Sequence, residues 1–175
     1  MTRVGLFFVL ALQVFAVCPA EGRATLERAG PWESYVTVND RGVALCGISQ
    51  FSEPYGFMLK YSLGEAYLHL SKTGWNVPAS ARMSLTFFVD GREVWTGRFS
   101  GTDTPRMIEG GFARTDDAIR FIRTFAWGRR MVIRFNDGTE APWTADLTGT
   151  LRVSRAFLAC ALHLEDRQRP TQPHR

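Results

Sequence analysis

The stretch 83–100 constrains the fold of this chain more than any other, because it predicts a β-hairpin. Leu85 and Phe87 belong to a run that alternates at the period of two that a strand requires. Asp90 and Gly91 then form a turn dipeptide, since glycine and short polar residues adopt positive φ at low cost. A second alternating run returns after the turn, with aromatic residues on both faces. We therefore expect a hairpin inside a sheet rather than a catalytic loop.

Further strand and helix patterns along the chain give the fold class. Stretches bounded by turn residues predict strands at 32–39, 43–49, 57–62, 66–71, 131–135 and 143–147. Hydrophobic residues make up 45% and charged residues 22%, which is typical of a globular protein. We expect an α+β fold, mainly an antiparallel β-sheet or sandwich of about eight strands with two helices packed on it. This single domain is predicted to span 32–165, between a flexible leader at 21–31 and a disordered tail at 166–175.

Both predicted helices are amphipathic, so each should bury one face against the sheet. The first follows Thr115 and ends at Gly128, and its apolar residues recur at helical spacing: Ala118, Phe121, Ile122 and Phe125. The second begins after 148–150, and its apolar stripe consists of Val153, Phe157, Cys160, Ala161 and Leu164.

Residues 1–20 have the pattern of a cleaved secretory signal peptide. Arg3 precedes an apolar run at 4–17, and small residues surround a predicted cleavage site after Ala20. A membrane anchor is the alternative, but roughly fourteen apolar residues are too few for a span that needs about 20. A bulky residue before Cys18 argues against a lipoprotein. We therefore expect a periplasmic or secreted protein that is not integral to a membrane.

Export makes the cysteine count informative. Once residues 1–20 are removed, Cys46 and Cys160 are the two cysteines left. In an oxidising compartment, two cysteines most simply form one disulfide bond. The alternative is two separate buried thiols. The disulfide would join the strand at 43–49 to the last helix.

The residues that usually carry catalysis are scattered. His69, His163 and His174 lie far apart in the sequence, and none is at metal-ligand spacing from a cysteine or a second histidine. Asp116 and Asp117 are adjacent, which is typical of a helix start rather than of an acid–base pair. The sequence therefore predicts no catalytic residues, no metal site and no cofactor. The formal net charge of +4 is too small to predict nucleic-acid binding.

Arginines gather around the first predicted helix and form the candidate binding patch. Its members are Arg120, Arg123, Arg129, Arg130 and the tryptophan Trp127, with Arg134 close by in the sequence. One interpretation is an ordinary solvated helix face. The other is a surface for an anionic envelope component or an acidic protein, since arginine and tryptophan are enriched at binding hot spots.

The order of these features resembles the invasion-associated locus B family of periplasmic proteins. The matching pieces are 46–50, the approach to a strand at 70–78, the turn at 89–91, the strand at 131–135 and the segment 145–149 before the last helix. The mid-chain cysteine pair of that family is absent here. The resemblance implies a non-enzymatic exported protein linked to the envelope or to host interaction, with an envelope or host protein as partner.

Two functional hypotheses follow. The first is an exported interaction protein without catalysis, and the second is a periplasmic enzyme whose site is assembled from scattered residues. A cleft that holds His69 with a carboxylate in hydrogen-bond reach would favour the enzyme. A flat aromatic or arginine-rich patch would favour binding.

Overall fold

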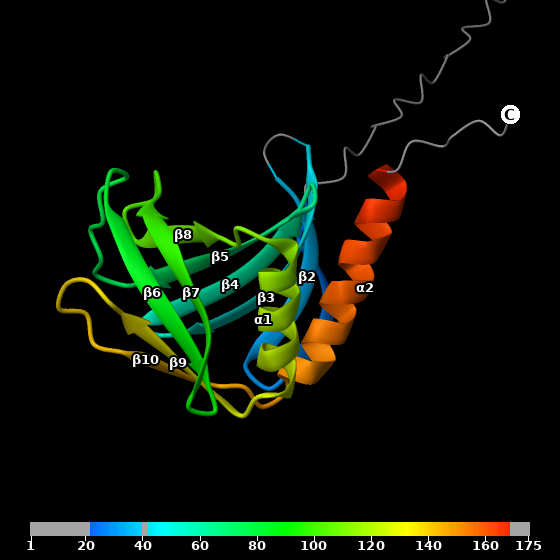
Figure 1. The fold of residues 1–175 in the computed structure, drawn as a ribbon. Helices are drawn as coiled ribbons and strands as arrows, with labels where there is room; N and C mark the ends of the chain where they lie inside the picture. The colour runs from blue at the N-terminus through cyan, green and yellow to red at the C-terminus, as the bar shows by residue number, and fades with distance from the viewer. Residues whose placement is uncertain (1–21, 40–41, 169–175) are drawn as a thin grey trace, which may run out of the picture.

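The computed structural model describes residues 22–39 and 42–168, so the predicted signal peptide lies outside the described residues. Within these residues, ten strands form one antiparallel sheet in the order β1-β2-β3-β4-β5-β8-β7-β6-β9-β10, and two helices pack on it (Figure 1). The strands are β1 (Ala24–Ala29), β2 (Trp32–Val38), β3 (Ala44–Ser52), β4 (Tyr55–Ser62), β5 (Glu65–Lys72), β6 (Arg82–Val89), β7 (Arg92–Gly101), β8 (Met107–Gly111), β9 (Arg130–Phe135) and β10 (Trp143–Asp146). The helices are α1 (Thr115–Trp127) and α2 (Thr150–Gln168). The α+β class is confirmed.

The strand number is ten rather than about eight, and β1 and β8 account for the difference. The prediction of a flexible leader is wrong for β1, which pairs with β2 at the sheet edge. Its Glu27 accepts a hydrogen bond from Arg152 of α2 at 2.5 Å, which ties this edge to the helix. At the other end of the chain, α2 continues to Gln168, three residues into the predicted tail. Residues 169–175 lie outside the described part of the chain.

The predicted hairpin lies inside the sheet, as expected. Its first strand, β6, pairs with β9, and its second strand, β7, pairs with β8. Leu85 and Phe87 of β6 are fully buried, and Phe87 meets Phe121 of α1 edge to face with 5.5 Å between ring centroids. This face of the hairpin therefore builds the core beneath the first helix.

The two helices lie side by side and antiparallel on the core face of the sheet (Figure 1). Helix α1 contacts β5 and β7, while α2 contacts β1 to β4. The faces turned toward the sheet bury Phe121 and Phe125 of α1 and Val153 and Phe157 of α2. Phe125 also packs edge to face on Trp32, with 5.0 Å between ring centroids. In the described part of the chain, no helix is both long and apolar enough to cross a membrane.

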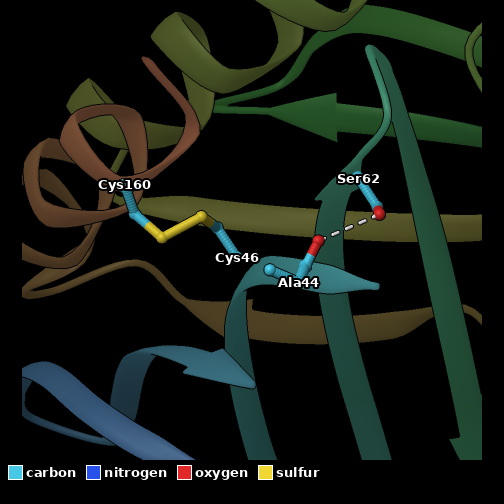
Figure 2. The surroundings of a disulfide bond; sticks show 4 residues. All are labelled: Ala44, Cys46, Ser62 and Cys160. Atoms are coloured by element: carbon cyan, nitrogen blue, oxygen red, sulfur yellow. Dashed lines mark hydrogen bonds between the residues drawn. A yellow bond between two sulfur atoms is a disulfide. The ribbon is translucent and has the colours of Figure 1, made fainter. Parts of the chain in front are cut away.

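The predicted disulfide between Cys46 and Cys160 is confirmed (Figure 2). It joins β3 to α2, with 6.0 Å between the two Cα atoms and a sequence separation of 114. Cys46 is fully buried on the core face of β3. Beside it, the hydroxyl of Ser62 donates to the carbonyl of Ala44 at 3.2 Å and links β4 to β3. The disulfide therefore fixes the last helix to the first half of the sheet.

The open sheet curls until its last strand reaches its first half. Trp143 of β10 lies 4.5 Å from Tyr55 of β4 between ring centroids. At the end of β10, the carbonyl of Asp146 accepts a hydrogen bond from the Trp32 indole at 2.8 Å. These contacts hold the curl without a continuous hydrogen-bond ladder.

A single carboxylate fastens one end of this curl. Glu140 accepts hydrogen bonds from Lys72 at 2.8 and 3.0 Å and from the indoles of Trp75 and Trp143 at 3.2 and 2.9 Å. Its side chain is only 22% exposed. Burial alone would raise the pKa of Glu140, but the hydrogen bonds and the charge of Lys72 outweigh it and lower that pKa. The ionised carboxylate is therefore a structural group.

Candidate functional site

The seam between α1 and α2 carries two neighbouring hollows, which we call the helical groove. The larger, of about 760 Å³, lies where the start of α1 meets the end of α2 and the β4–β5 turn. The smaller, of about 280 Å³, lies between the end of α1 and the start of α2. Ile119, Ile122 and Leu158 line both hollows, so the groove is one continuous surface with an apolar middle.

Large apolar side chains stand exposed along this groove. Trp127 is 69% exposed at the end of α1 and Leu162 is 62% exposed near the end of α2, and Ile119 and Leu158 between them are also exposed. They lie on the helix faces opposite to those that pack on the sheet. A contiguous exposed apolar stretch of this kind is typical of a surface that binds a partner or a membrane.

The two ends of the helical groove carry opposite charges. Arg123 and Arg155 line the smaller hollow, and no carboxylate lines it. Glu65 and Glu165 line the larger hollow, which Arg114 and Glu109 also border. The hydroxyl of Tyr61 donates a hydrogen bond to the Glu165 carboxylate, and burial together with this bond raises the pKa of Tyr61 to about 12. The groove is therefore basic at one end and acidic at the other.

The structure brings together only part of the predicted arginine patch. Arg120, Arg123 and Trp127 all lie on α1. Trp127 lines the smaller hollow with Arg123, and on its other side it lines a shallow depression of about 660 Å³ with Arg120. Asp90, Arg92 and Glu93 also line that depression. Trp127 therefore stands between two arginines of α1, and 69% of it is exposed.

The remaining arginines lie beyond the end of α1. The backbone N–H groups of Arg129 and Arg130 donate to the carboxylate of Asp90 at 3.1 and 3.0 Å, which fixes the turn between α1 and β9. Arg130 and Arg134 alternate along β9 with buried core residues, so their side chains lie on the sheet face turned away from the helices. The Arg134 guanidinium stacks 4.9 Å from the ring of Phe88 there.

A second group of polar side chains lies on that outer sheet face, and it includes His69. Lys60 and His69 contact each other across β4 and β5 at 3.1 Å between Nζ and Nδ1, and His69 Nε2 contacts the carboxylate of Glu109 on β8. Because the Lys60 ammonium can only donate, Nδ1 of His69 accepts the hydrogen bond from Lys60. Nε2 of His69 then carries the hydrogen and donates a hydrogen bond to the Glu109 carboxylate. The hydrogen bond from His69 is the largest cause that lowers the pKa of Glu109, against the effect of burial. Burial lowers the pKa of Lys60.

This outer group has the titratable side chains of an active site, yet His69 lines neither hollow of the helical groove. Beside it, the ring of Tyr35 lies across Gly47, where a Cβ atom would come within 2.3 Å of the ring. Arg23 stacks on the other side of Tyr35 at 3.6 Å. On this part of the outer sheet face, the Tyr35 ring and Arg23 therefore cover the surface next to the polar group. Among the residues that the structure describes, no three histidine, cysteine, aspartate or glutamate side chains gather to hold a metal ion.

No protein-family model, no curated protein and no solved structure matches this chain. The resemblance to the invasion-associated locus B family therefore stays a prediction.

Sequence reasoning found α1 and its arginines but missed both the groove and the outer polar group. The contact between His69 and Glu109 depends on the pairing of β5 with β8, which no local sequence pattern predicts. The groove could have been anticipated in part, because Leu158 and Leu162 lie outside the apolar stripe that α2 turns to the sheet. Leucines on the solvent side of a helix, outside its buried stripe, are the sequence pattern that could have indicated an exposed groove here.

Proposed function

We propose that this chain is an exported, non-enzymatic binding protein of the bacterial envelope, periplasmic or secreted, that binds an anionic membrane surface through the end of α1. The observation that carries the proposal is the exposed Trp127 between Arg120 and Arg123. The disulfide and the secretory pattern of residues 1–20 support export, since such bonds persist in oxidising compartments.

The physical chemistry of this combination favours a lipid surface. Tryptophan is enriched where a protein meets the membrane interface, because its ring is apolar and its N–H is polar. Each basic residue near an anionic membrane contributes about 1 kcal/mol of attraction. Arg120 contacts Asp117 within its own helix, whereas Arg123 has no carboxylate lining its side of Trp127. The attraction is therefore moderate and should depend strongly on salt.

Vesicle flotation tests this proposal. The purified protein should float with vesicles that contain phosphatidylglycerol and not with vesicles of phosphatidylcholine alone. The double variant Arg120→Glu/Arg123→Glu should weaken binding by at least about thirtyfold, because it removes roughly 2 kcal/mol of attraction and adds repulsion. Added salt should weaken binding of the wild type as well.

Arg98→Glu/Arg134→Glu is the matched control, because it also reverses two charges, both on the sheet face turned away from α1. Its binding should stay close to that of the wild type. If the α1 variant floats as well as the wild type, or if the control loses as much binding, the end of α1 is not the contact surface and the proposal fails.

A periplasmic enzyme remains the second candidate function, and the contact of His69 with Lys60 and Glu109 is the observation that favours it. In that reading, Lys60 with its lowered pKa is a nucleophile and His69 is its proton acceptor. A small electrophilic acyl probe distinguishes the two functions. An enzyme should be acylated rapidly at Lys60, and His69→Gln should slow that reaction strongly. A network that is only structural should show no such dependence on His69.

A further inference from the structure

The face of α2 that lines the helical groove has the spacing of a helix–helix seam. Leu151, Arg155, Leu158, Leu162 and Glu165 follow one another at intervals of four, three, four and three residues. This is the a/d pattern with which two helices pack knobs into holes. All five side chains line the groove, and Arg155, Leu158 and Leu162 are exposed. The sheet packs on a different stripe of α2, so Leu158 and Leu162 of this face are left exposed in the single chain.

The charges on this face of α2 are complementary to those of a second, antiparallel copy of the same helix. Arg155 lies toward the start of α2 and Glu165 toward its end, and the two exposed leucines lie between them. Arg155 and Glu165 are each five residues from Cys160, while Leu158 and Leu162 are each two residues from it. The pattern is therefore symmetric in position and opposite in charge about the level of Cys160.

We propose that two copies of this chain form a dimer in which their α2 helices pack antiparallel along this seam, with the two-fold axis at the level of Cys160. Arg155 then lies opposite Glu165 of the partner subunit, and Leu158 lies opposite Leu162 of the partner subunit. Each pair occurs twice, as an isologous interface requires. An antiparallel helix pair matches a positions with d positions, and both pairs satisfy that rule.

Parallel packing of the same helices is disfavoured by the same charges. It would set Arg155 against Arg155 and Glu165 against Glu165 of the partner subunit, and like charges at a seam repel. Ile119 of α1 borders the seam, and because it is exposed it would add apolar contact to the partner helix. Arg123 and Trp127 of α1 also line the smaller hollow, but neither takes part in the Arg155–Glu165 and Leu158–Leu162 pairs that define the dimer. Mass measurements without vesicles therefore test the dimer separately from membrane binding.

Charge-reversed variants test the dimer through its symmetry. Light scattering of the purified wild type should give twice the monomer mass at high protein concentration. Arg155→Glu alone places two glutamates together and should give the monomer mass, and Glu165→Arg alone places two arginines together and should do the same. An equimolar mixture of the two variants restores both Arg–Glu pairs, so it should recover the dimer mass. The double variant Arg155→Glu/Glu165→Arg should also dimerise.

Tyr61→Phe is the control for the Glu165 variant, because it removes the hydrogen bond to Glu165 and leaves the seam charges unchanged. It should dimerise like the wild type. Circular dichroism before the mass measurement shows whether each variant is folded. A wild type that is monomeric at every concentration would overturn the proposal and leave the groove to another occupant, such as an acyl chain. A dimer that persists in both single variants, or a mixture that stays monomeric, would overturn it as well.

Discussion

Removal of the disulfide between Cys46 and Cys160 should lower the stability of this protein by several kcal/mol. The bond closes a loop of 114 residues, and the chain-entropy model assigns about 4.7 kcal/mol to a loop of roughly 100 residues. A domain of this size loses about 2–4 °C of melting temperature for each kcal/mol. We therefore expect the variant Cys46→Ala/Cys160→Ala to melt roughly 10–20 °C below the wild type.

Thermal unfolding followed by circular dichroism measures this difference. Reductant should lower the melting temperature of the wild type and leave that of the double alanine variant unchanged, which separates loss of the bond from loss of the side chains. Thiol titration of the unfolded, unreduced protein should find no free thiol among these two cysteines. If the reduced wild type melts at the same temperature as the oxidised protein, the bond does not hold α2 on the sheet.

Three further predictions concern single side chains. Glu140→Gln should cost about 1–3 kcal/mol at neutral pH, because Lys72 loses its charged partner. The folded-state pKa of Glu140 is lowered, so the stabilisation that its carboxylate gives the fold is present above the ordinary carboxyl pKa of about 4.3 and is lost as pH falls through the lowered value. Denaturant titrations should therefore show the stability difference between the wild type and Glu140→Gln shrinking in acid. Lys60 should react with an amine-acylating reagent at lower pH than an ordinary lysine, as peptide mass spectrometry can follow, since burial lowers its pKa. Gly47→Ala should lower the melting temperature by an amount equivalent to about 1–3 kcal/mol, because the new methyl group would meet the Tyr35 ring, and an unchanged melting temperature would contradict this contact.

The strands and helices that the sequence predicted share one property: their apolar residues follow a regular period on a buried face. The hairpin around Asp90 and Gly91 and the stripe of α1 are of this kind. Strand β1 was missed because it is an edge strand whose Leu26 is exposed, so its alternation does not separate apolar from polar residues. Strand β8 is short and contains two glycines, so the loop-like composition of 101–114 indicated at most a short strand at 106–108.

The candidate site was harder to predict because sequence neighbours do not stay neighbours in space. Arg123 and Arg130 are seven residues apart, yet one lies on a helix and the other on the far face of a strand. His69 and Glu109 are forty residues apart, yet they touch. The disulfide was predictable because the predicted removal of residues 1–20 leaves two cysteines, so that pairing needed no knowledge of the fold.

Quenching of Trp127 by brominated lipid tests the central claim most directly. The other four tryptophans are buried or half-buried, so the difference in fluorescence between the wild type and Trp127→Phe reports on the exposed indole at the end of α1. Vesicles of brominated phosphatidylglycerol should quench this difference signal, and brominated phosphatidylcholine should leave it unchanged. If the wild type and Trp127→Phe are quenched to the same extent, or if the anionic vesicles quench neither, then the end of α1 does not meet the membrane.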